Sequence, residues 1–67
     1  MKPEEYLRAL KRLGLTVASK RTAEVLGIAV RQSMRYGSGE QPVSAPIAKL
    51  LRAMVKWKLD PDEVREL

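Results

Sequence analysis

The stretch SKRTAEVLGIAVRQSMRYGSG, Ser19–Gly39, decides the fold of this chain. Ser19 is a good helix N-cap, with Thr16 as an alternative, and the helix that follows is expected to run to Leu26. Gly27 comes directly after it, and glycine adopts the left-handed conformation that ends many helices. The stretch therefore begins with a short helix that closes in a tight turn.

A second short helix is expected over 29–37. Ile28 follows the turn and is predicted to be a buried anchor. Ser33 and Tyr36 fall on the inward face of this helix, according to the helical period. The run Gly37-Ser38-Gly39 is expected to break the helix, because glycine is a poor helix former. Two short helices joined by such a turn form a helix-turn-helix, whose second helix fits a DNA major groove.

Three further helices flank this unit. Start signals such as Pro3 and the run Asp60-Pro61, together with apolar residues at helical spacing, predict them. The expected ranges are 3–13, 45–58 and 61–66. No segment alternates with a period of two, so residues 1–67 are expected to form one all-α domain, a bundle of five helices.

Composition narrows the chemistry that this chain can support. The 67 residues include no Cys and no His, which excludes disulfides and removes the usual zinc ligands. The sequence offers no nucleophile with an adjacent base and no glycine-rich phosphate loop. We therefore expect no cofactor, no metal and no enzymatic activity. The absence of Cys fits a reducing cytoplasm, and no apolar run has the ~20 residues of a membrane span.

Charge is distributed unevenly along the chain. The formal net charge is +5, and residues 1–59 carry a net +8 whereas 60–66 carry a net −3. A basic body that ends in an acidic segment is typical of a polyanion-binding surface kept away from the C-terminus. Solubility alone is an equally good explanation of the basic charge, and the charge by itself leaves both interpretations open.

The order of small, apolar and aromatic residues around the turn resembles that of the Cro/phage-repressor (XRE-like) helix-turn-helix regulators. The matching positions are Ala23, Leu26, Gly27, Ile28, Tyr36 and Gly39. The resemblance implies a lambda-repressor-like five-helix fold with the motif at 19–39. It also implies a sequence-specific DNA-binding transcriptional regulator, a repressor by preference, that inserts helix 29–37 into the major groove of double-stranded DNA.

Three positions depart from the family pattern. Thr22 and Ser33 stand where the family usually has aliphatic residues, and Ala29 replaces the usual Ser or Thr cap of the second helix. The hydroxyls of Thr22 and Ser33 are each expected to hydrogen-bond back to the preceding turn of their own helix. Because small side chains bury little apolar area, these departures bear on the packing angle of the two helices.

By position in the motif, one set of residues is predicted to face base edges and another to face phosphates. The base-edge set is Ala29, Val30, Arg31, Gln32, Met34 and Arg35. The phosphate set is Ser19, Lys20, Arg21, Ser38 and Gln41. Arg suits guanine, because its fork meets O6 and N7 together. The alternative is that Arg31 and Arg35 simply solvate an exposed helix face.

The C-terminal third, 45–67, is expected to hold a homodimer that reads a palindromic operator, since a chain this short has a small core. The predicted interface residues are Met54, Val55, Trp57 and Leu59. Trp57 has two interpretations, as a dimer anchor or as core packing against helix 3–13. The expected location is the cytoplasm, at the nucleoid, with no membrane partner.

A different class of function stays open beside DNA binding. The same fold can serve as a protein-interaction module, such as an antitoxin, an adaptor or a phage-encoded inhibitor. In that case Arg31 and Arg35 would meet an acidic protein surface. Sequence preference and a steep dependence of affinity on salt separate the two classes.

Overall fold

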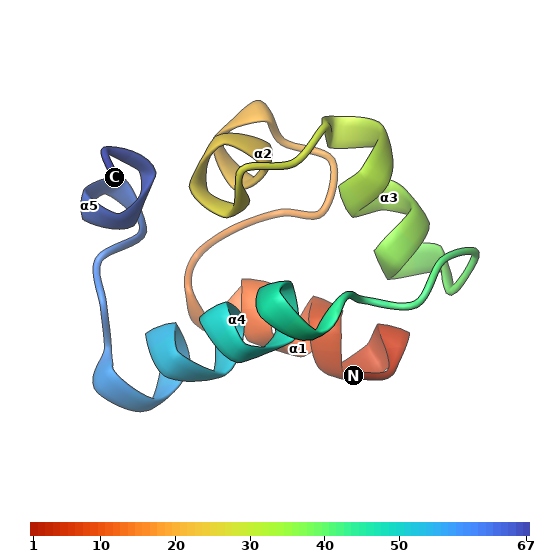
Figure 1. The fold of residues 1–67 in the computed structure, drawn as a ribbon, viewed down its shortest axis with the longest axis horizontal. Helices are drawn as coiled ribbons and strands as arrows, with labels where there is room; N and C mark the ends of the chain where they lie inside the picture. Colours follow the sequence, from red (N-terminus) through yellow and green to blue (C-terminus); the bar gives the residue numbers. More distant parts are fainter.

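The computed structural model describes residues 1–67 as five α-helices without a strand (Figure 1). The prediction of an all-α chain with five helices is confirmed, and the expected helix ends differ from the observed ones by a residue at most. The observed helices are α1 Pro3–Arg12, α2 Lys20–Leu26, α3 Val30–Ser38, α4 Ala45–Trp57 and α5 Pro61–Arg65.

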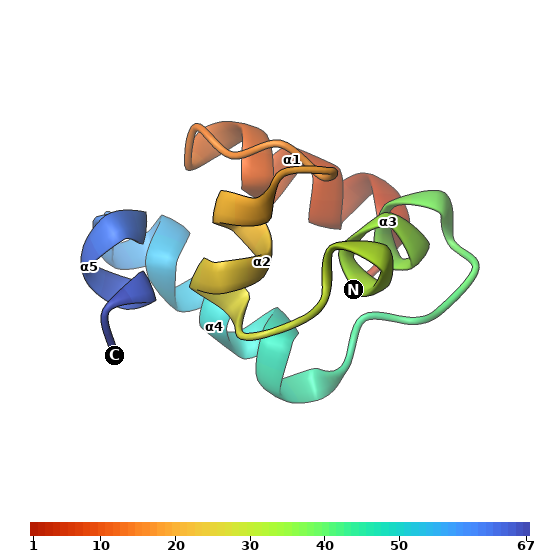
Figure 2. The same ribbon diagram turned by 90° about the horizontal axis from the view of Figure 1, so that it is seen from above.

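The helices surround one apolar core. α1 packs against both α3 and α4, and α2 lies between α3 and α5 (Figures 1 and 2). The short C-terminal helix therefore returns to α2, which precedes it by about half the chain. The buried apolar side chains of the core cluster are Tyr6, Ala9, Leu10, Leu15, Val25, Leu26, Tyr36, Leu51 and Met54.

The helix ends follow the local signals that predicted them. Ser19 Oγ accepts a hydrogen bond from the Thr22 backbone N–H at 3.1 Å and caps α2. Gly27 ends that helix in the left-handed region, at φ 69°. Asp60 Oδ1 accepts from the Asp62 backbone N–H at 2.9 Å and caps α5. These contacts span only a few residues, so the sequence alone predicts them.

The predicted end of α3 within Gly37-Ser38-Gly39 is confirmed, and the residue that ends the helix is Gly39 rather than Gly37. The helix continues through Gly37 to Ser38, and Gly39 ends it in the left-handed region at φ 82°. Gly37 lies where α3 approaches the segment between α1 and α2. A Cβ atom there would be 2.7 Å from Val17 Cγ2 and 3.2 Å from Leu7 Cδ2. Close packing, rather than chain reversal, therefore requires this glycine.

The hydroxyls of Ser33 and Thr22 were expected to hydrogen-bond to the preceding turn of their own helices, and this prediction is wrong. Ser33 Oγ donates to the Val17 carbonyl at 2.7 Å and lies 2.6 Å from the Tyr6 hydroxyl. Thr22 Oγ1 donates to the Thr16 carbonyl at 2.6 Å. Both hydroxyls thus hydrogen-bond to backbone carbonyls of the α1–α2 connection and hold it against α2 and α3.

Candidate nucleic-acid interface

The outward face of α3 carries two cations that no other group of the protein neutralises. Arg31 and Arg35 are exposed, one turn apart, and neither takes part in an ion pair. Met34 lies between them in sequence and is 51% exposed. A shallow hollow on this face is lined by Val30, Arg31, Met34, Arg35, Ser38 and Glu40. Arginine forks beside apolar atoms therefore form an open, mostly basic surface.

The inward face of α3 holds this surface in a fixed orientation. Tyr36 is buried, and its ring meets the Tyr6 ring edge-to-face, with centroids 5.5 Å apart and planes at 76°. Ser33 is fully buried beside them. Such aromatic pairs have a preferred geometry and add to the stability of the core. α3 is thus anchored to α1 by its buried side while its other side is free.

Some of the residues predicted to face base edges have exposed side chains, and others are half-buried or hydrogen-bonded within the protein. Ala29 is exposed at the start of α3, and Val30 is half-buried. Gln32 is half-buried, and its Nε2 donates to the Tyr36 hydroxyl at 2.8 Å. Its amide is therefore turned along the helix toward the core edge, whereas Arg31 and Arg35 reach outward.

The predicted phosphate-binding residues also differ in whether their side chains are already engaged in contacts within the protein. Lys20 is exposed and forms no ion pair. Ser19 is committed to its capping bond, and Ser38 Oγ donates to the Arg35 carbonyl at 3.2 Å. Gln41 is half-buried, and its backbone N–H donates to the same carbonyl at 3.2 Å. Among these four, Lys20 offers the charge that would attract a phosphate.

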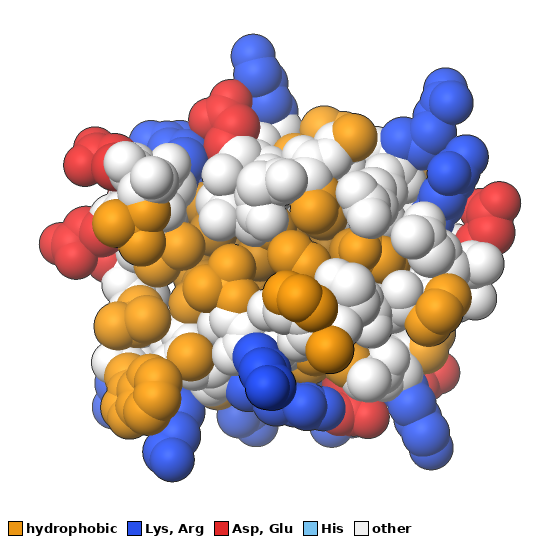
Figure 3. Space-filling model, viewed as in Figure 1, with side chains coloured by type: hydrophobic (Ala, Val, Ile, Leu, Met, Phe, Trp, Pro, Cys, Tyr) orange, Lys and Arg blue, Asp and Glu red, His pale blue; other side chains and the backbone are white.

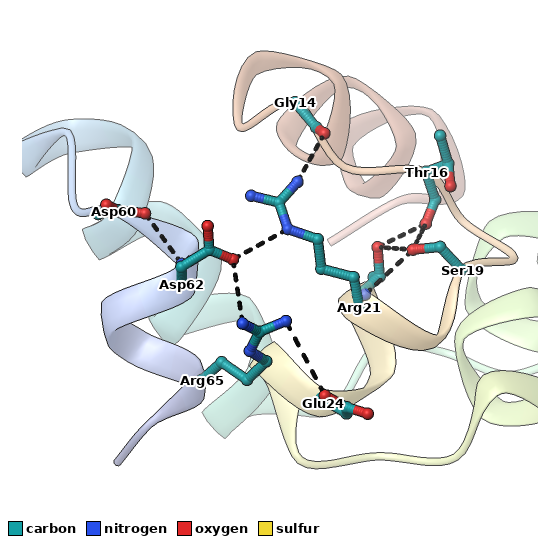
Figure 4. Close-up of polar contacts among 9 residues, drawn as sticks. Gly14, Thr16, Ser19, Arg21, Glu24, Asp60, Asp62 and Arg65 are labelled. Atoms are coloured by element: carbon teal, nitrogen blue, oxygen red, sulfur yellow. Dashed lines mark hydrogen bonds and ion pairs between the residues drawn. The ribbon is translucent and has the colours of Figure 1, made fainter.

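Arg21, which the sequence assigns to the phosphate set, is engaged in contacts within the protein. Its Nε donates to Asp62 Oδ1 at 3.0 Å, and its Nη1 donates to the Gly14 carbonyl at 3.4 Å (Figure 4). The hydrogen bond from Arg21 lowers the pKa of the Asp62 carboxyl. Arg65 approaches the same Asp62 oxygen at 3.6 Å and Glu24 at 4.0 Å. The acidic C-terminal segment therefore lies against α2.

The predicted dimer residues are not all available to a partner. Met54 is 0% exposed and belongs to the core, so its assignment to an interface is wrong. Val55 is half-buried. Trp57 is 62% exposed and Leu59 is 40% exposed. The alternative that Trp57 packs in the core is also wrong: its ring faces outward, with Lys56 Nζ 5.4 Å from the ring centroid.

Apolar atoms are also visible across the molecular surface. Figure 3 shows hydrophobic side chains gathered over the middle of one face, with Lys and Arg side chains at its upper and lower edges and Asp and Glu side chains mainly at its left edge. No group of three or more Asp and Glu residues is arranged to hold a metal ion.

No helix is both long and apolar enough to cross a membrane.

Comparisons of the chain with protein-family models, with curated proteins and with solved structures found no match.

Proposed function

We propose that this chain is a sequence-specific DNA-binding protein and a transcriptional regulator, in which α2, the turn Gly27-Ile28-Ala29 and α3 act as a helix-turn-helix. In this proposal α3 enters the major groove and presents its outward face to base edges. The observation that carries the proposal is the exposed, unpaired pair Arg31 and Arg35, one turn apart on α3.

Like charges at this spacing repel each other by roughly 0.2–0.5 kcal/mol in the free helix. An acceptor group placed between the two side chains relieves the repulsion. Guanine O6 and N7 accept both N–H groups of one arginine fork, and apolar side chains contact the thymine methyl. Met34 and Val30 supply apolar contacts beside the two arginines. The face therefore matches the chemistry of a major groove edge.

The surroundings of α3 limit how DNA approaches. Glu40 lines the same hollow as Arg31 and Arg35, and its carboxylate repels a phosphate. Lys20, at the beginning of α2, is the free cation of the predicted phosphate set. We propose that the DNA backbone passes beside Lys20, and that Glu40 faces bases, where a carboxylate can accept from cytosine N4.

We further propose that two copies associate through the exposed Trp57 and Leu59 and read a palindromic site. Large exposed aromatic side chains are enriched at the centres of protein interfaces. A two-fold dimer places its recognition helices about one DNA turn, ~34 Å, apart.

Selection of bound duplexes from a random library tests the proposal. The expected result is a consensus sequence, with two inverted half-sites if the protein is a dimer. Affinity for the consensus should exceed non-specific affinity by roughly 10³-fold or more and fall steeply with salt. A library that yields no enriched sequence contradicts the proposal and favours the protein-interaction class.

A further inference from the structure

A second basic surface lies away from the outward face of α3. A groove runs between α1 and α4. Its lining includes four cations and one carboxylate: Arg8, Arg12 and Glu5 from α1, and Arg52 and Lys56 from α4. Figure 3 shows Lys and Arg side chains along the lower edge of the molecule, where α1 and α4 lie in Figure 1. Each rim of the groove therefore carries two cations, and with Glu5 the side chains of the lining have a formal net charge of +3.

These four cations are not neutralised within the protein. All are exposed, and none takes part in an ion pair. Arg8 and Arg12 are four residues apart on α1, and Arg52 and Lys56 are four residues apart on α4. Like charges at this spacing destabilise a helix. An anionic partner in the groove would remove the repulsion on both helices at once.

The floor between the two rims is apolar. Ala9 and Leu51 are buried there, and the apolar side chains that stay partly accessible are Val55 and Met1, both half-buried. Beyond Arg12 and Val55 the surface continues toward Leu13 and Leu59, near the end of α4. The groove thus has an apolar stripe with positive charge on each side of it.

We propose that the groove between α1 and α4 binds an acidic amphipathic helix of a partner protein. The apolar stripe of that helix would lie on Val55 and Met1, above the buried Ala9 and Leu51. Its carboxylates would meet the arginines and the lysine on both rims. An amphipathic helix in a groove is a common mode of peptide recognition. Complementary charge on both rims favours one helix chemistry over others.

Charge and shape favour this occupant over three others. A nucleic-acid backbone has no apolar stripe to cover the floor. A second copy related by a two-fold axis through the groove would bring the same four cations against these, which like-charge repulsion opposes. A flat lipid surface does not enter a groove between two helices. The proposal is independent of DNA binding, because neither α1 nor α4 contributes to the outward face of α3.

The test uses the full chain and a synthetic probe. The probe is a labelled helical peptide of about 15 residues, or four turns, with a leucine stripe flanked by glutamates. Fluorescence anisotropy should show saturable binding. The variants Arg12→Glu and Arg52→Glu should each weaken it by ~3–10-fold, since reversal removes an attraction and adds a repulsion. If either variant is poorly folded by circular dichroism, Arg12→Gln and Arg52→Gln replace them.

The matched controls are Lys11→Glu and Lys49→Glu, exposed cations of α1 and α4 that do not line the groove. They change the net charge equally and should leave the affinity almost unchanged. On the unaltered protein, peptide addition should shift the backbone amide resonances of α1 and α4 and spare those of α3.

Several results would overturn the proposal. One is the absence of saturable peptide binding. Another is equal weakening by the control variants, or equal binding of an acidic peptide whose leucines are replaced by glutamine. A third is a pattern in which Arg12→Glu and Arg52→Glu abolish binding to duplex DNA or anionic vesicles while peptide binding is absent. The groove variants Arg12→Glu and Arg52→Glu should leave the sequence-specific binding of duplex DNA unchanged. Their effect on peptide binding can then be assigned to the groove and not to α3.

Discussion

The hydroxyl oxygens of Tyr6 and Ser33 lie 2.6 Å apart in the core and join α1 to α3. Ser33 donates its proton to the Val17 carbonyl, so the Tyr6 hydroxyl must be the donor toward Ser33. Burial raises the pKa of Tyr6, which keeps this donor protonated. One small polar side chain therefore satisfies both a buried phenol and a buried backbone carbonyl, and it fixes α3 relative to α1.

Ser33→Ala should destabilise the fold by ~1–3 kcal/mol, because it leaves the Tyr6 hydroxyl and the Val17 carbonyl without a partner. Urea denaturation followed by circular dichroism measures the change. Tyr6→Phe is the matched control, and the double variant should cost less than the sum of the two single changes. Strict additivity would show that the two hydroxyls do not interact.

Arg31→Ala and Arg35→Ala should each weaken binding to the selected DNA sequence by ~1–3 kcal/mol per half-site and relax the preference at one base position. Both side chains are exposed, so thermal stability should not change. A mobility-shift titration measures the affinity. Lys49→Ala removes an exposed charge on α4 and serves as the control. Equal losses in all three variants would point to general electrostatic attraction instead.

Gly37→Ala should destabilise the protein even though alanine is the better helix former. The gain in helix propensity, ~1 kcal/mol, is opposed by a Cβ placed 2.7 Å from Val17 Cγ2, and such overpacking costs ~1–3 kcal/mol. Adding Val17→Ala should restore part of the loss. At Gly27 an added Cβ meets nothing within 4 Å, so Gly27→Ala costs backbone strain alone and Val17→Ala should not rescue it.

The pair Arg21–Asp62 predicts a pH dependence of stability. The folded pKa of Asp62 lies below its unfolded value, with the hydrogen bond from Arg21 as the main cause. The pair therefore stabilises the fold above about pH 4, and this contribution is lost as pH falls through the lowered folded pKa. Asp62→Asn should melt below wild type at neutral pH.

The difference in melting temperature between wild type and Asp62→Asn should shrink as pH falls from about 4 through the lowered folded pKa of Asp62, because protonation makes both side chains neutral. It should also shrink at high salt, because both partners are substantially exposed. Glu66→Gln, an exposed carboxylate without an ion pair, is the control. A constant difference across this pH range would assign the effect of Asp62→Asn to something other than the ion pair.

Trp57→Glu should convert a dimer into a monomer without unfolding it, since the side chain is 62% exposed and lies outside the core. Sedimentation equilibrium of both proteins measures the association. Lys49→Glu makes a larger change of charge on the same helix and should leave the dimer intact. A wild-type chain that stays monomeric well above micromolar concentration would refute the dimer and leave the DNA-binding proposal untouched.

The sequence predicts those parts of the molecule that depend on a few neighbouring residues. The caps Ser19 and Asp60 and the left-handed Gly27 act within one turn, so their pattern is sufficient. The contacts between Tyr6 and Ser33 and between Arg21 and Asp62 join residues 27 and 41 positions apart. No local pattern encodes such distances, so the sequence does not predict the ion pair between Arg21 and Asp62.

The same reasoning applies to the outward face of α3. Helical period alone predicts the exposure of Arg31 and Arg35, which needs no knowledge of distant contacts. It does not predict that Gln32 turns toward the Tyr36 hydroxyl, nor that Gly37 packs on Val17, because both depend on how closely α3 approaches other elements.

The outward position of Trp57 determines what tryptophan fluorescence can measure in this protein. It is the single tryptophan of the chain, and its ring is largely exposed in the single chain. In a monomer its emission should therefore change little on unfolding, so denaturation of a monomer is better followed through the buried rings of Tyr6 and Tyr36. Any event that covers the end of α4 should move the tryptophan emission to shorter wavelength. The native protein thus carries an intrinsic optical probe of its own surface, separate from the signals of its core.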